Sequence, residues 1–369
     1  MSSNDRNGGS PPESDRVPGA AHPRHAPAVI GHDAAAADFL ASADAHRLHH
    51  AWLITGPRGV GKATLAWAIA RWLLAGGAPG GLAVPPEDPV ARRLAALSEP
   101  RLHLVRRGFD DKTGRMRAEI GVEDIRALLS FFHLSAAEGG RRVAIVDAAD
   151  DMNGPAANAL LKMLEEPPKG GTILLIAHQP ARLLPTIRSR CRELRLMPLS
   201  PEDMARVLHD MGVDADAQAL SALSGGSVGE ALRLAGQDGL KTYAGIVDLF
   251  ATLPRFDRQK ARAFAEAAGG RATADGDPFD LRITLLDRFL TRLARSGLMG
   301  APVPEAAPGE GALMARLCPD ADAARIWAGA QAELSARARA GRAVNLDPAA
   351  LVMDMLAQLA GMAPAHAKA

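Results

Sequence analysis

The stretch that decides the fold of this chain reads Gly56-Pro57-Arg58-Gly59-Val60-Gly61-Lys62-Ala63. It has the glycine and lysine spacing of a P-loop, in which backbone N–H groups surround phosphate oxygens and the lysine reaches the terminal phosphates. An apolar run at residues 51–55 precedes the loop, and residues 64–74 carry apolar side chains at helical spacing. Strand, glycine loop and helix therefore follow one another in the order that a P-loop requires.

One residue of this loop departs from the pattern. Position 63 is alanine, where a serine or threonine hydroxyl would ligate magnesium. Thr64 lies about 100° further round the helix, so its hydroxyl does not replace the missing ligand. The residues of this degenerate loop are Gly56, Gly59, Gly61, Lys62 and Ala63. They predict the fold, together with weak or absent nucleotide binding.

Composition describes an ordinary globular protein. The 369 residues are 47% hydrophobic and 23% charged, and a net charge of +1 creates no overall field that attracts nucleic acid. The two cysteines, Cys191 and Cys318, form no metal-ligand cluster. No apolar stretch is long enough to span a membrane or to act as a signal peptide, so we expect a cytoplasmic protein without a membrane partner.

The chain divides by pattern into four parts. Residues 1–27 are rich in Pro, Gly, Ser and His, which predicts a disordered tail with solvated histidines. Residues 28–198 alternate strand and helix patterns, which predicts an α/β core with a doubly wound parallel sheet. Strand patterns then cease, so residues 199–271 predict a small helical lid and residues 272–369 an all-α C-terminal domain.

A second feature of P-loop ATPases is incomplete. Residues 142–147 form a β-branched run that ends in Asp147, at the position of the acid that supports magnesium. The next residue is usually a glutamate that activates water, and here it is Ala148. Asp150 and Asp151 come too late to point into the same pocket and indicate a solvated loop or a helix cap. The general base is therefore missing.

Two longer motifs carry a resemblance to a known family. Residues 158–168 read Asn-Ala-Leu-Leu-Lys-Met-Leu-Glu-Glu-Pro-Pro, and residues 189–191 read Ser-Arg-Cys. With these motifs the chain resembles the delta prime subunits of bacterial DNA polymerase III clamp loaders, in the AAA+ class, over residues 29–235. Further on, only the arrangement of helices and residues 345–347 (Asn-Leu-Asp) support the likeness. It implies an AAA+ core, a lid and a C-terminal collar that joins subunits into a pentameric ring.

The resemblance also implies a role for Ser189, Arg190 and Cys191. Arg190 becomes an arginine finger supplied in trans, neutralising charge on the γ-phosphate of ATP held by the neighbouring subunit. ATP and magnesium are then expected on that neighbour, with no cofactor on this chain. Relatives usually carry a four-cysteine zinc module after the P-loop helix, but residues 76–89 contain no cysteine. We therefore expect no zinc and no other metal site.

A third departure agrees with the first two. ATPase members of the family carry an arginine in the lid at a Gly-Ser-x-Arg motif, and residues 226–229 here read Gly-Ser-Val-Gly. Hydroxyl, base and sensor are lost in one chain, whereas Arg190 remains. This pattern predicts a non-catalytic clamp-loader subunit. Its expected partners are gamma/tau and delta subunits and, through the assembly, the sliding clamp and primer-template DNA.

Other functions stay open. A gamma/tau-like ATP-hydrolysing motor, or another AAA+ ATPase, would bind nucleotide, and Ala63, Ala148 and Gly229 count against it. A stand-alone DNA-binding regulator would need a basic stripe, and the basic residues 106–117 are interpreted as a solvated hairpin instead. No acidic pair is placed to hold the two metals of nucleotidyl transfer, so any polymerase activity would belong to the assembly.

Overall fold

The chain forms two compact units, Met1–Leu199 and Ser200–Ala369. The computed structural model describes residues 13–17, 20–44, 48–110, 113–133, 140–272 and 276–362. The division between the units falls one residue from the end of the predicted α/β core. Each unit has its own hydrophobic interior and is described separately below.

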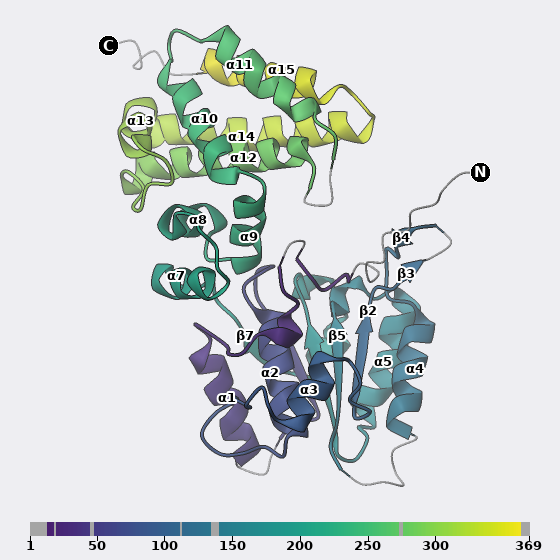
Figure 1. The fold of residues 1–369 in the computed structure, drawn as a ribbon. Coiled ribbons are helices and arrows are strands. Elements are labelled where there is room, and N and C mark those ends of the chain that lie inside the picture. Colours follow the sequence, from purple (N-terminus) through teal and green to yellow (C-terminus); the bar gives the residue numbers. More distant parts are fainter. Residues whose placement is uncertain are drawn as a thin grey trace, which may run out of the picture. The chain divides into compact units, whose positions relative to one another are not determined.

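A parallel sheet forms the centre of the first unit (Figure 1). Within the described residues five strands pair in the order β2-β5-β6-β1-β7. These strands are β1 (Ala51–Thr55), β2 (Leu102–Arg106), β5 (Arg142–Asp147), β6 (Gly171–Ile176) and β7 (Arg192–Arg195). In register, Ala51 of β1 lies opposite Ile173 of β6, and Leu53 lies opposite Glu193 of β7. Helices cover both faces, so the predicted doubly wound α/β class is confirmed.

Alternation along the strands divides the core into two layers. Trp52 and Ile54 face α2, and Phe39 of α1 packs on the same side. Leu53 faces the other way, toward the layer of α4 and α5. Because successive side chains of a strand point to opposite faces, a strand that is buried throughout supplies both layers. This arrangement fixes the sheet between two layers of helices.

The helices of the first unit begin and end where local signals place them. They are η1 (Pro23–His25), α1 (Asp33–Asp44), α2 (Lys62–Leu74), α3 (Pro89–Ala95), α4 (Val122–His133), η2 (Ala149–Asp151), α5 (Gly154–Glu165), η3 (Pro180–Arg182) and α6 (Pro185–Arg188). The side chain of Asn153 accepts a hydrogen bond from Ala156 N–H and caps α5. Pro167 and Pro168 follow the last turn, since proline cannot continue a helix.

Two short elements differ from the sequence-based expectation or refine it. Strand β7 is not predicted by its residues, because three of its four side chains are charged and only Leu194 is buried. It forms an edge of the sheet, where charged side chains remain in solvent. The basic residues after β2 form a hairpin of β3 (Phe109–Asp110) and β4 (Arg115–Met116), in agreement with the hairpin interpretation.

The predicted disordered tail is wrong for residues 13–17 and 20–27, which pack on the core. His22 is 2% exposed and lies 3.0 Å from the Asp15 carboxylate, and its ring meets Trp67 of α2 edge-on. Arg71 of α2 donates to the backbone carbonyl of Arg24. This segment is ordered by ion pairs and hydrogen bonds instead of apolar burial, so composition alone does not reveal it. Residues 1–12 and 18–19 of the predicted tail lie outside the described residues.

The described part of the second unit is built of helices. They are α7 (Pro201–Asp210), α8 (Ala217–Ser224), α9 (Val228–Gly236), α10 (Gly239–Ala251), α11 (Arg258–Glu266), η4 (Ala267–Gly269), α12 (Pro278–Met299), α13 (Glu310–Leu317), α14 (Ala321–Ala343) and α15 (Pro348–Met362). Phe250 of α10 packs on Phe289 of α12 and on Trp327 of α14. Helix α10 thus shares a core with the C-terminal helices, and the separation of a lid at residue 271 stays a prediction.

Among the helices that the structure describes, none combines the length and the apolar character needed to cross a bilayer.

Candidate functional site: a degenerate P-loop and an arginine motif

The P-loop connects β1 to α2 at the carboxyl edge of the sheet, where open α/β folds place their ligand sites. Gly56 has φ +139° and Gly61 has φ +108°, conformations that L side chains rarely adopt. A Cβ on Gly56 would also lie 2.4 Å from the carbonyl oxygen of Leu196. The loop therefore needs its glycines for geometry, whether or not it binds phosphate.

Lys62 is turned back onto its own loop. The whole residue is 3% exposed. Its ammonium group donates to the carbonyl oxygens of Gly56 at 2.7 Å and Pro57 at 2.6 Å. The buried Nε2–H of His32 donates to the Val60 carbonyl at 2.6 Å and holds the same loop from outside. In this arrangement the lysine braces the loop, and Ala63, the first residue after it, offers no hydroxyl for a metal.

Asp147 lies at the end of β5 and is 7% exposed. Burial raises the pKa of Asp147 to about 7 and lowers the pKa of Lys62 to about 8. Burial outweighs the attraction between the two groups, which favours the charged form of each. Ala148 follows and is buried, so the residue after Asp147 supplies no carboxylate to activate water. The acid of the second motif is present, but its charge is poorly solvated and the general base is absent.

Asp150 corrects one sequence-based interpretation. It is 9% exposed, and its carboxylate accepts the backbone N–H groups of His178 and Gln179 at 2.9 and 3.0 Å. Its charge also favours the ammonium form of Lys62 and disfavours the carboxylate form of Asp147, so Asp150 lies near enough to influence both groups. The short turn η2 brings it back toward the sheet, and sequence distance alone did not reveal this. Burial lowers the pKa of His178 to about 4, which leaves its ring neutral at pH 7.

We expect Asp147→Asn to flatten the pH dependence of stability. The folded pKa of Asp147 lies above its unfolded value near 3.8, so the native state holds the extra proton and stability falls as pH rises from about 4 to 7. In wild type the free energy of unfolding should therefore decrease by on the order of 2 kcal/mol between pH 5 and pH 8, and this decrease should be absent in the variant. Urea unfolding followed by tryptophan fluorescence measures it, with exposed Asp214→Asn as the control. Parallel profiles for wild type and Asp147→Asn would contradict the expectation.

Arg190 lies on a different part of the core, just after α6. Its side chain is 37% exposed, and one Nη donates to Glu165 Oε1 at 3.0 Å, at the end of α5. The other Nη donates to the carbonyl oxygen of Thr186 at 3.1 Å, which also accepts the Ser189 hydroxyl. The structure thus joins the two motifs of residues 158–168 and 189–191 through one ion pair. In the described residues no hydrogen bond or ion pair links Arg190 to the P-loop.

Cys191 completes the motif as a packing residue. It is half-buried against the layer of α4 and α5, and burial raises the pKa of its thiol to about 12. A thiol with this pKa is not a nucleophile at neutral pH. Among the described residues no group of three or more His, Cys, Asp or Glu side chains is arranged to hold a metal ion, and the absence of zinc stays a prediction.

Three arginines of the basic turn after β2 pair with carboxylates of the same chain. Arg106 pairs with Glu13 at 3.1 Å and with Asp15, Arg107 pairs with Asp151 at 3.0 Å, and Arg117 pairs with Asp124 at 3.0 Å. Surface cations that already have carboxylate partners contribute little to a field that attracts DNA. Three arginines in the described part of this region therefore have carboxylate partners, which does not favour a stand-alone DNA-binding regulator.

The matched family covers the part of the chain that holds both sites. Residues 31–200 match the family described as DNA polymerase III, delta subunit, a range that includes the P-loop, Asp147 and the Ser-Arg-Cys motif. This segment is similar to DNA polymerase III delta subunits. The match agrees with the resemblance inferred from the sequence.

Individual relatives support the same assignment. The DNA polymerase III subunit delta' of Pseudomonas aeruginosa is 41% identical over 209 residues, covering 54% of this chain and 60% of the relative. The same subunit of Bacillus subtilis is 34% identical and covers 60% and 64%. The subunit gamma/tau of Mycobacterium tuberculosis is 30% identical over 51% of this chain and 32% of its own length. The chain thus spans about three fifths of the delta' relatives' length.

Similarity to solved structures is more distant. A gamma subunit-related protein of Thermotoga maritima matches 89% of this chain and 100% of its own, with 16% identity and a TM-score of 0.37.

Proposed function

We propose that this chain is a non-catalytic subunit of a DNA polymerase III clamp loader and that it supplies Arg190 in trans to a neighbouring ATPase subunit. The P-loop lacks residues that ATP hydrolysis needs, whereas the arginine motif is intact, and this contrast supports the proposal. The P-loop lacks its hydroxyl at Ala63 and its base at Ala148, while Lys62 is engaged by loop carbonyls. Arg190, in contrast, is partly exposed and oriented by Glu165.

The residues at the P-loop do not fit magnesium-bound ATP. Magnesium there would need a hydroxyl ligand that Ala63 lacks and an ionised acid, and burial holds the pKa of Asp147 near 7. We therefore assign ATP and magnesium to the neighbouring subunit and no cofactor to this chain. Its proposed partners are gamma/tau and delta subunits, with the sliding clamp and primer-template DNA reached through the assembly.

The proposed chemistry needs only this chain's guanidinium. Arginine presents a planar fork of N–H donors that stays charged at all physiological pH values, and it neutralises charge that develops on a phosphoryl group. Glu165 holds that fork in one orientation before assembly, which lowers the entropy lost when the subunits meet. The chain would then help clamp loading because it controls ATP hydrolysis by the neighbouring subunit.

Calorimetry with magnesium-ATP tests the first half of the proposal. We expect no binding heat from the isolated chain at nucleotide concentrations up to about 1 mM, which corresponds to less than about 4 kcal/mol of binding free energy. Lys62→Ala serves as the matched variant, because any heat that persists in it does not come from the P-loop. Tight binding that Lys62→Ala abolishes, with turnover by the isolated chain, would favour the gamma/tau-like motor instead.

A further inference from the structure

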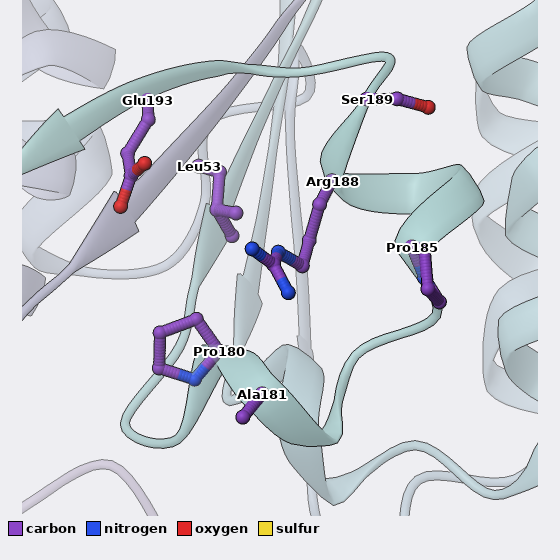
Figure 2. A pocket seen from close by; sticks show the side chains of 7 residues that line it. All are labelled: Leu53, Pro180, Ala181, Pro185, Arg188, Ser189 and Glu193. Atoms are coloured by element: carbon purple, nitrogen blue, oxygen red, sulfur yellow. The ribbon is translucent and has the colours of Figure 1, made fainter.

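An open cavity of about 550 Å³ lies beside the Ser-Arg-Cys motif (Figure 2). Four elements of the first unit contribute to it: β1, η3, α6 and β7. Its lining residues are Leu53, Pro180, Ala181, Pro185, Arg188, Ser189 and Glu193. The walls are mainly apolar, and the Arg188 side chain extends from α6 toward Pro180 and Leu53. The cavity therefore combines apolar walls with one cation, Arg188, and one carboxylate, Glu193.

The charge of Arg188 is unpaired, unlike that of the arginines that follow it. Arg190 pairs with Glu165, and Arg192 pairs with Asp38. Within the described residues, no hydrogen bond or ion pair engages the exposed guanidinium of Arg188. The carboxylate of Glu193 is already bound by the Thr55 hydroxyl at 2.6 Å. The cavity thus has an unsatisfied positive charge at its side.

The chemistry of the walls favours a protein carboxylate as the occupant. A glutamate or aspartate side chain places its methylene groups on proline and leucine while its carboxylate meets the guanidinium fork. A nucleic-acid backbone would need several cations in a row, and Arg188 is the one cation among the residues that line the cavity. Arg188 lies two residues before Arg190, so an acidic side chain bound here belongs to the subunit that Arg190 reaches.

We infer that this cavity receives an acidic side chain of the neighbouring ATPase subunit, so that Arg188 anchors the interface at which Arg190 acts. This inference rests on the proposed function, and it gives Arg188 and Arg190 different roles. Arg188 contributes affinity between subunits, and Arg190 contributes to hydrolysis. Arg188 is thus a docking residue of this chain that the Ser-Arg-Cys motif does not include.

The test measures assembly of the full chain with purified gamma/tau and delta subunits of the same bacterium. Fluorescence titration should show that Arg188→Glu weakens binding at least tenfold and Arg188→Ala less so, because reversal adds repulsion to the lost attraction. Binding by Arg188→Ala should also depend less on salt. The matched control is Arg141→Glu, an exposed arginine at the amino end of β5, which should bind as wild type does. Melting curves confirm that the variants fold.

Other results would overturn the inference in distinguishable ways. If wild type assembles and Arg190→Ala lowers hydrolysis, but Arg188→Glu binds gamma/tau and delta with unchanged affinity, the cavity is not the docking site while the proposed function stands. If Arg188→Glu assembles normally and loses only binding of primer-template DNA to the loader, the occupant is nucleic acid. If wild type fails to assemble, the proposed function and the docking site fail together.

Discussion

Arg190→Ala should reduce ATP hydrolysis at the neighbouring site that this residue is proposed to serve by a factor of about 10³ to 10⁵, the range known for arginine fingers supplied in trans. Removal of the guanidinium leaves charge on the transferred phosphoryl group without its partner. The assembled loader should keep the turnover of its other sites. The effect is measured in complexes in which those other sites are inactivated, with clamp and primer-template DNA present.

Two further variants test whether the loss of ATP hydrolysis is specific to the guanidinium of Arg190. Arg190→Lys should fail almost as badly, because an ammonium lacks the planar fork that contacts two oxygens at once. Arg192→Ala is the matched control, since that arginine pairs with Asp38 and lies over Trp52 of its own chain. It should leave hydrolysis unchanged. Full hydrolysis by the Arg190→Ala complex would remove the trans-acting role from this chain.

Glu310→Ala should destabilise the second unit by about 3 to 5 kcal/mol, the cost typical of breaking a buried ion pair from one side. Glu310 is fully buried. Its two carboxylate oxygens accept from Arg292 at 2.7 and 2.8 Å, and one also accepts the Ala306 N–H at 2.6 Å. The Tyr243 hydroxyl donates to the same carboxylate, and burial raises the pKa of that hydroxyl, so it stays a donor. Removal of the carboxylate leaves Arg292 charged and unpaired.

Urea unfolding, followed by tryptophan fluorescence and far-UV circular dichroism, measures this change, and Trp327 is the tryptophan of the second unit. Glu333→Ala, at an exposed position on α14, is the control and should stay within about 0.5 kcal/mol of wild type. Replacing Glu310 and Arg292 together with leucine and methionine should cost much less than Glu310→Ala, since no buried charge is left alone. A loss below about 1 kcal/mol for Glu310→Ala would show that the network does not stabilise the unit.

Local patterns were sufficient for the elements around the P-loop. Residues 51–54 and 143–146 are apolar throughout, and buried parallel strands have this pattern whatever the rest of the chain does. Strand β7 was missed because its charged residues fit an edge position that only the sheet order defines. The ordered segment at residues 13–17 and 20–27 was missed for a related reason, since its stability comes from partners distant in sequence, such as Arg106 and Arg71.

The sequence by itself determined the α/β class, the position of the glycine loop and the loss of its hydroxyl and base, because these depend on residue type and short-range spacing. Only the tertiary structure decided which charges meet. The chain has 43 basic and 42 acidic residues, and nothing local selects Glu165 for Arg190 or leaves Arg188 without a carboxylate. Such pairings depend on distances of a few ångströms between separate elements, which packing of the core sets.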